Sequence, residues 1–331
     1  MFQPRSPRLV AYFTLLFLVG AWLASGPARA DSVYTVQNVA VDASATSAAE
    51  ARSVALAEGH LIAFERLLRR LVLAEDLVLL PVLESPEIAA LIDGFVIEKE
   101  LVSSIRYRAN LILYFNKISV RKLLRQRKIR FAETRSNDML VVPVFDIGDG
   151  PTLWLEPGDW RSAWLARPID EGLVSLVLPL GDVIDMAAID ASQAQAPSRN
   201  ELLVLADRYG TQEVVVASAD LALPDEPLSN RNSHGVTAAE GDLMENTEPD
   251  LSESRRVRGE VEDAILELTV HRVGVARERT STELLRGGSS ESLDDFLARA
   301  VGRVLAQVEG AWKQANMLRF GRESRLSILI P

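Results

Sequence analysis

The feature that most constrains the fold is a short, almost unbroken apolar run, MLVVPVF, at residues 139–145. Polar residues precede it at 135–138, and a turn-forming cluster of Asp, Gly and Pro follows it at 146–151. A short apolar run between such boundaries is typical of a strand that is buried on both faces of its sheet. The sequence therefore predicts a sheet that has this strand at its centre and not at its rim.

Two similar apolar runs follow, at Leu173–Leu178 and Glu213–Ala217, with helical patterns between them. This order predicts a mixed-sheet α/β sandwich domain over residues 138–316. Upstream, residues 31–132 show the order strand, helix, strand, strand, helix, which indicates a small α+β domain. The expected fold class is thus α+β and α/β, in two domains, and the 331 residues are enough for both.

Within the small domain, apolar residues recur at helical spacing from Ala48 to Val72. Three arginines are expected on the outward face of this helix: Arg66, Arg69 and Arg70. Two further segments, Gly94–Ser103 and Ser104–Phe115, alternate or are rich in apolar residues. They predict an antiparallel pair of strands, which a helix through Lys128 follows.

The first 30 residues have the pattern of a cleaved secretory signal peptide. Arg5 and Arg8 form a basic start, a predominantly apolar run of 16 residues follows at 9–24, and Ala28-Arg29-Ala30 is an A-x-A cleavage site. The alternative is an uncleaved membrane anchor, but the run is shorter than the roughly 20 residues that a spanning helix needs. The chain has no cysteine, so it has neither disulfides nor a lipid-anchor site. A secreted chain without disulfides indicates the periplasm.

The formal net charge of −10 argues against a global role in binding nucleic acid. Eight acidic residues and one arginine lie between Asp225 and Glu253, within a Pro-, Ser- and Gly-containing stretch that we expect to be a flexible insertion at 224–253. Residues 317–331 end in another strand-like run, RLSILI at 325–330. We expect them to begin a further segment that is truncated in this sequence.

The strongest local charge is a helical run of basic residues at Lys117–Arg130, which contains no acidic residue. Four of its residues are candidates for binding an anionic membrane surface or an acidic partner: Lys117, Arg121, Lys122 and Arg125. The alternative is a solvated helix face, or one that the acidic insertion covers.

Two tryptophans, Trp160 and Trp164, are spaced four apart after a helix start. They are therefore expected on one face of a helix. Such rings serve either as core packing over the sheet or as a platform on which a carbohydrate or a partner stacks. We keep both residues as candidate binding residues.

The chain contains no nucleophile motif, phosphate loop or dinucleotide-binding fingerprint. Its three histidines, His60, His234 and His271, are far apart, so neither a metal site nor a cofactor is predicted. The one candidate set of catalytic acids follows a predicted strand end, where α/β sheets bind ligands. It comprises Asp182, Asp185 and Asp190. The alternative for these residues is helix capping, and we assign no catalytic residue.

The order of these segments resembles a Gram-negative envelope family known as domain of unknown function 2066. The resemblance rests on YTVQNVAVD at the first strand, SIRYRANLILYFN before the basic helix, and LVVPVF. The second domain, with LVLPLGD and LADRYGTQEVVVAS, is similar to TolB amino-terminal and curli-secretion-lipoprotein type periplasmic domains. These families imply an α/β fold and envelope-assembly or adaptor roles, without catalytic residues. The lipidated cysteine of the lipoprotein relatives is missing here.

The sequence therefore favours a non-enzymatic periplasmic envelope protein that binds a protein or an envelope polymer, through the second domain. One alternative is a periplasmic hydrolase that uses carboxylates near Asp182 and Asp185. The other is a membrane-surface protein that docks through the basic helix.

Overall fold

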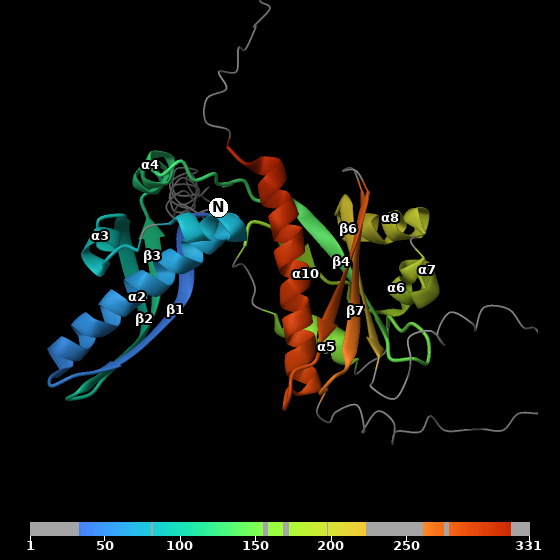
Figure 1. The fold of residues 1–331 in the computed structure, drawn as a ribbon, viewed down its shortest axis with the longest axis horizontal. Helices are drawn as coiled ribbons and strands as arrows, with labels where there is room; N and C mark the ends of the chain where they lie inside the picture. Colours follow the sequence, from blue (N-terminus) through green and yellow to red (C-terminus); the bar gives the residue numbers. More distant parts are fainter. Residues whose placement is uncertain are drawn as a thin grey trace, which may run out of the picture.

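The computed structural model describes residues 33–80, 82–154, 158–167, 172–196, 198–222, 261–274 and 278–318. The predicted signal peptide, the acidic insertion and the strand at 325–330 lie outside these ranges. Two sheets with covering helices confirm the predicted combination of α+β and α/β structure (Figure 1). Within the described ranges, no helix combines the length and the apolar character needed to cross a membrane.

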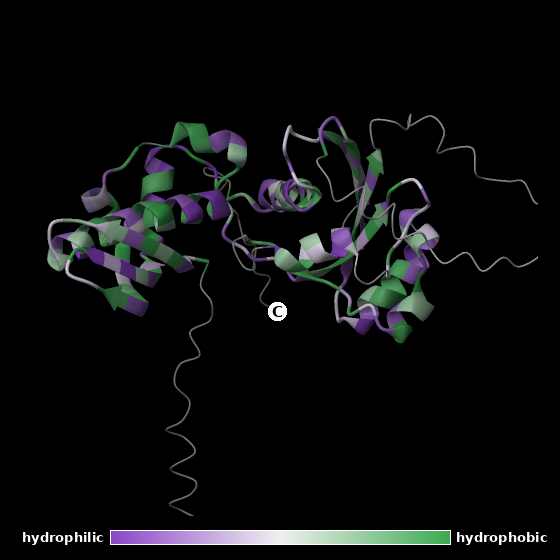
Figure 2. Ribbon diagram, turned by 90° about the horizontal axis from the view of Figure 1, so that it is seen from below, coloured by the Kyte–Doolittle hydropathy of each residue, from purple (hydrophilic) through white to green (hydrophobic). Residues whose placement is uncertain are grey.

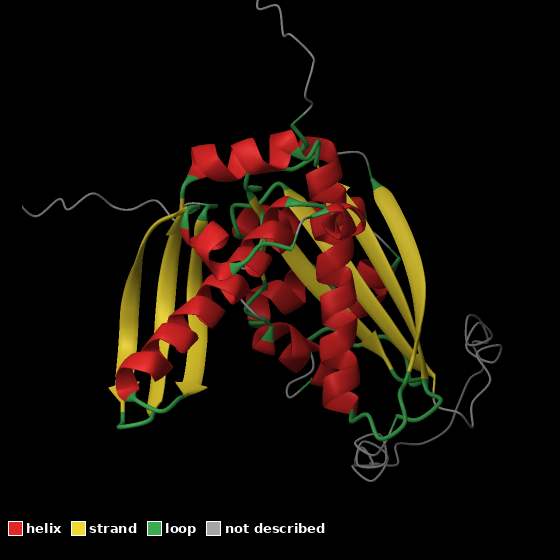
Figure 3. Cartoon of the chain, turned by 60° about the vertical axis from the view of Figure 1, so that its left-hand side comes forward, coloured by secondary structure: helices red, strands yellow, loops and turns green. Residues whose placement is uncertain are grey.

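The first domain is a three-stranded antiparallel sheet with the strand order β1-β3-β2. A long helix, α2, lies along one face of this sheet (Figure 3). The elements in chain order are β1 (Thr35–Ser44), α2 (Ala48–Leu71), the 3-10 helix η1 (Ala74–Leu79), α3 (Ser85–Ala89), β2 (Ile92–Val102), β3 (Arg106–Phe115) and α4 (Lys117–Gln126).

Every second side chain of β3 points into the core of this domain. Tyr107, Leu111 and Leu113 are fully buried, and residues of opposite hydropathy alternate along the strands (Figure 2). Helix α2 packs closely because Gly59 faces the sheet: a Cβ added there would lie 2.7 Å from Leu111 Cδ1. Close packing of helix on sheet thus depends on a residue without a side chain.

The second domain is a five-stranded mixed sheet with the order β5-β4-β6-β7-β8. β4 runs parallel to β5 and β6, whereas β7 and β8 continue the sheet antiparallel. Helices α5 and α10 cover one face, and α7 and α8 cover the other (Figure 1). The elements are β4 (Asp138–Asp146), α5 (Asp159–Ala166), β5 (Ser175–Val177), α6 (Val183–Ala188), α7 (Ala191–Gln195), α8 (Arg199–Arg208), β6 (Glu213–Ala222), β7 (Ile265–Gly274), β8 (Arg279–Arg286) and α10 (Leu293–Asn316).

Strand β4 is the MLVVPVF run, and it lies inside the sheet between β5 and β6. Met139 and Val141 belong to the core under α10, while Leu140, Val142 and Val144 belong to the core under α7 and α8. All five are at most 2 % exposed. The run is apolar without alternation because helices cover both faces of the strand.

The run at Leu173–Leu178 is not the long buried strand that its composition predicts. Only Ser175–Val177 form β5, a half-buried strand at the edge of the sheet. The backbone N–H groups of Val174 and Ser175 donate to side chains, those of Glu309 and Ser136, at 2.8 Å and 3.0 Å. The segment is therefore held by polar contacts as well as by pairing with β4.

Candidate functional site

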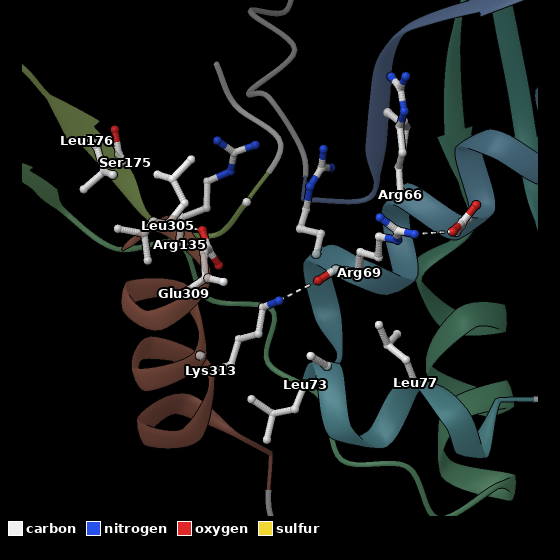
Figure 4. Close-up of a pocket in the computed structure, with 18 of the residues that line it drawn as sticks. Arg66, Arg69, Leu73, Leu77, Arg135, Ser175, Leu176, Leu305, Glu309 and Lys313 are labelled. Atoms are coloured by element: carbon white, nitrogen blue, oxygen red, sulfur yellow. Dashed lines mark hydrogen bonds and ion pairs between the residues drawn. The ribbon is translucent and has the colours of Figure 1, made fainter. Parts of the chain in front are cut away.

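Helix α10 joins the two domains through a buried lysine. Lys313 is 7 % exposed, and its Nζ donates to the backbone oxygens of Arg69 and Val72 at 2.5 Å and 3.2 Å (Figure 4). These carbonyls lie at the C-terminal end of α2, where helix oxygens lack intrahelical partners and favour a cation. Burial lowers the pKa of Lys313. A residue of the second domain thus caps the long helix of the first.

The segment between the domains is also held in place. Trp312 Nε1 donates to Thr134 O at 2.7 Å, and the Leu318 N–H donates to Phe131 O at 3.0 Å. Further along, the Ser136 N–H donates to Leu173 O at 2.8 Å. Backbone N–H and C=O groups that are removed from water need hydrogen-bond partners. For the linker, these partners are Trp312 of α10, Leu318 just after it, and Leu173 just before β5. These contacts fix the orientation of one domain on the other.

A cleft of about 1010 Å³ lies between the two domains. Its walls come from β1, α2 and η1 on one side and from α10, β5 and the linker on the other (Figure 4). Protein pockets that bind small ligands typically measure about 300–1,000 Å³ and lie often at domain interfaces. The volume and the position of this cleft therefore suit a bound ligand.

The described lining of the cleft is strongly basic, although the whole chain carries a net charge of −10. Two acidic residues, Glu65 and Glu309, line it. Against them stand six basic residues: Arg66, Arg69, Arg70, Arg135, Arg167 and Lys313. Among the described residues, the lining thus has an excess of four positive charges.

Backbone carbonyls hold several of these cations in place. Arg66 donates to Asn38 O at 3.1 Å. Arg70 donates to Val33 O and Thr35 O at 2.8 Å and 2.7 Å. Arg167 donates to Trp164 O and Leu176 O, each at 2.7 Å. A carbonyl oxygen carries no formal charge and orients the guanidinium that donates to it, so these contacts fix the positions of the cations in the cleft wall.

The two acids have partners of their own. Glu65 pairs with Arg69 one helical turn later at 2.6 Å, on a solvent-exposed face of α2. Glu309 accepts the N–H of Val174 at 2.8 Å and lies against Gly172, where an added Cβ would clash with its carboxylate at 1.8 Å. Glu309 therefore anchors β5 to α10.

Part of the cleft wall is apolar. The aliphatic side chains of Val, Leu and Ile in it come from β1, α2, η1, β5 and α10 and from the residues beside them: Val36, Ile62, Leu73, Leu77, Val174, Leu176 and Leu305. A wall that mixes fixed cations with aliphatic side chains can contact both the charged and the apolar part of one molecule.

No pattern in the sequence predicts this cleft. Arg70 was expected on the outer face of its helix, whereas it is 5 % exposed. Arg70 is turned inward because it donates to the carbonyls of Val33 and Thr35, just before and at the start of β1. The available signal was the triplet of arginines in the last turns of that helix, together with a lysine near the end of α10.

None of the candidates on the basic helix α4 lines the cleft. Arg121 Nε donates to Glu133 at 2.8 Å, Tyr34 Oη donates to the same carboxylate at 2.6 Å, and Lys117 Nζ lies 5.8 Å from the centre of the Tyr34 ring. These two cations therefore help to attach the linker. Lys122 and Arg125 are exposed, and the acidic insertion proposed to cover them lies outside the described residues.

The stacking platform proposed for Trp160 and Trp164 is not formed. The two side chains are 1 % and 0 % exposed, and their rings contact edge to face at 5.9 Å. Trp160 Nε1 donates to Ala217 O of β6 at 2.9 Å. Both rings pack α5 onto the sheet and present no face to a ligand.

The aspartates after β5 are structural. Asp182 caps α6, and its carboxylate pairs with Arg208 of α8 at 2.6 Å. Asp185 is 0 % exposed and accepts hydrogen bonds from Tyr209 Oη at 2.7 Å and from Arg208. The hydrogen bond from Arg208 holds the pKa of Asp182 well below its usual range, so Asp182 is not suited to act as a general acid.

Asp190, the third of these aspartates, caps α7, where its side chain accepts the Gln193 N–H at 2.8 Å. None of the three aspartates lines the cleft between the domains. The helix-capping alternative thus accounts for Asp182 and Asp190, and an ion-pair network accounts for Asp185.

No family model and no curated protein matches the chain. Among solved structures, it is similar to a formyltetrahydrofolate deformylase from Pseudomonas putida KT2440. The two share 11 % sequence identity and a TM-score of 0.22, over 84 % of this chain and 92 % of that one. A TM-score this low does not establish a common fold, so nothing of that protein's chemistry transfers to this chain.

Proposed function

We propose that the chain is a non-enzymatic binding or adaptor protein of the periplasmic cell envelope, and that its partner is an envelope protein or polymer. The cleft between the domains carries this proposal. It is large, it is bounded by elements of both domains, and its charge is opposite to that of the whole chain. The periplasmic address rests on the signal-peptide pattern, and the adaptor role also agrees with the family resemblance.

The binding site is assigned to the cleft and not to the second domain alone. Lys313 and Trp312 hold the domains together through hydrogen bonds that do not involve a ligand. A preorganised cleft loses less entropy when it binds than one that must first assemble. This arrangement suits recognition, because the lining cations are in position before a partner arrives.

Photo-crosslinking in the native cell tests the proposal. Ala74 is exposed and lines the cleft, so a benzophenone amino acid at this position should crosslink to the partner. The matched control is Val204 of α8, which is 64 % exposed and lies outside the cleft lining. An adduct from position 74 that position 204 does not give supports the proposal. No adduct from position 74, or the same adduct from both positions, contradicts it.

A second candidate function is docking to an anionic membrane surface through α4. The observation in its favour is Ile118, which is 77 % exposed on the helix that also carries Lys122 and Arg125. Exposed aliphatic and basic side chains together are typical of interfacial helices. Co-sedimentation with vesicles tests it: binding should require anionic lipid and should fall in the K122Q/R125Q variant. Binding that does not depend on lipid charge would contradict this function.

A further inference from the structure

The excess of positive charge in the cleft lining indicates the charge of the ligand that it binds. Six basic and two acidic residues line it in the part of the chain that the structure describes, and charges in a partly enclosed space interact more strongly than charges in open water. The lining would repel a cationic ligand, and a neutral ligand would gain no charge–charge attraction from it. The ligand that matches this lining is an anion.

The kind of cation narrows the choice of anion. Five of the six basic residues are arginines, and the planar guanidinium fork matches the oxygens of a phosphate group in a bidentate manner. Arg66 and Arg69 approach from α2, whereas Arg135 lies on the side of α10 (Figure 4). Both walls of the cleft therefore present guanidinium groups.

The aliphatic wall indicates that the ligand is not a bare anion. Leu73 and Leu77 lie on the side of α2 and η1, and Leu176 and Leu305 lie on the facing side (Figure 4). A cleft of about 1010 Å³ exceeds what an inorganic phosphate fills. Contact with a hydrocarbon chain would remove apolar surface from water and add to the affinity.

We propose that this cleft binds an amphiphile with a phosphate head group, its phosphate on the arginines and its hydrocarbon part against the leucines. This ligand class rests on the proposed function, which assigns the cleft as the binding site. Free phosphate offers the same head-group chemistry without a hydrocarbon chain, and a comparison of ligands distinguishes these two sources.

Isothermal titration calorimetry with the full chain tests the ligand class. The probes are dodecyl phosphate below its micelle concentration, inorganic phosphate, and dodecyl maltoside, which has the same chain with an uncharged head. We expect binding of dodecyl phosphate, with much weaker binding of the other two. Equal affinity for inorganic phosphate would overturn the amphiphile, and equal affinity for dodecyl maltoside would overturn the role of the phosphate.

Two variants test whether dodecyl phosphate binds in the cleft. R66Q/R69Q removes two cleft arginines that lie on the surface of α2, and loss of charge-assisted hydrogen bonds should weaken dodecyl phosphate binding about tenfold or more. The matched control is R52Q on the same helix, which removes an exposed arginine paired with Glu100 outside the cleft lining. It should bind as the wild type does. Equal binding by all three proteins, with circular dichroism showing that each is folded, would overturn the site.

The two proposals fail in different ways. If position 74 crosslinks a partner in the cell but dodecyl phosphate does not bind, then the ligand class is wrong while the binding function stands. If dodecyl phosphate binds in an arginine-dependent way but no partner is crosslinked, then the cleft is a lipid-like ligand site and the protein-adaptor function fails.

Discussion

An ion pair between Asp182 and Arg208 connects the start of helix α6 to the end of α8. Arg208 also pairs with the buried Asp185. Three aspartates near the end of a strand have the composition of an acid–base site, but each already has partners. Asp182 and Asp190 accept backbone N–H groups at helix N-termini. Asp182 and Asp185 accept from Arg208, and Asp185 also accepts from the Tyr209 hydroxyl. A carboxylate that is permanently paired in this way stabilises the fold and does not transfer protons.

The ion pair predicts how stability depends on pH. Arg208 lowers the pKa of Asp182 in the folded state, whereas an unfolded aspartate titrates at about 3.9. The unfolded state therefore binds more protons as the pH falls, so the stabilising contribution of Asp182 is present above about pH 4 and is lost below it. We expect D182N to flatten the fall of the unfolding free energy between neutral and acidic pH, as measured by urea denaturation.

The double variant D182N/R208Q is the control for this prediction. If the two residues act through one interaction, then the double variant should be less destabilised than the sum of D182N and R208Q at neutral pH. Strict additivity would show that the pair is not coupled and would contradict the explanation of the pH dependence.

At the scale of elements, two glycines in long helices should respond to alanine in opposite ways. An added Cβ at Gly59 of α2 meets Leu111 at 2.7 Å and Val41 at 3.0 Å, while nothing lies within 4 Å of one at Gly302 of α10. We expect G302A to raise the unfolding free energy by about 0.5–1 kcal/mol, because alanine favours the helix. G59A should lose this gain to overpacking, at a cost of about 1–3 kcal/mol.

Urea denaturation of both variants measures the difference. They change the same residue type inside helices of the same length, 24 residues each, so intrinsic propensity cancels between them. A stabilised G59A would mean that the sheet of the first domain can shift to accommodate a methyl group, and that α2 is not held as closely as the structure indicates.

Elements with strong periodicity could be predicted from the sequence, and elements that depend on their neighbours could not. Helix α2 and strand β4 were expected close to their observed bounds, because one apolar stripe or one apolar run defines each. The predicted length of β5 was wrong. β5 pairs only with Asp138–Leu140 of β4, and beyond Leu140 the strand β4 pairs with β6 only. The 3-10 helix η1 is short and carries no full period, so no pattern identified it.

At the scale of the whole molecule, the cleft could not be predicted because its two sides are remote in sequence. The hydrogen bond from Lys313 to Arg69 O joins residues that are 244 positions apart. The basic residues of α2 are unremarkable on an isolated helix, and they form a charged wall only where α10 lies opposite them. Spatial convergence of this kind leaves no local signal in a single sequence.

The same hydrogen bonds predict how firmly the domains are held. Replacing Lys313 with methionine keeps the aliphatic stem but leaves Arg69 O and Val72 O without their shared donor, so we expect the domains to move relative to each other. Because the chain has no cysteine, V54C/V204C places one spin label on each domain at exposed positions. Electron double resonance should give a narrow distance distribution with Lys313 and a broader one with K313M. The exposed substitution K122M should leave the width unchanged, and equal widths in all three proteins would show that Lys313 does not hold the cleft in shape.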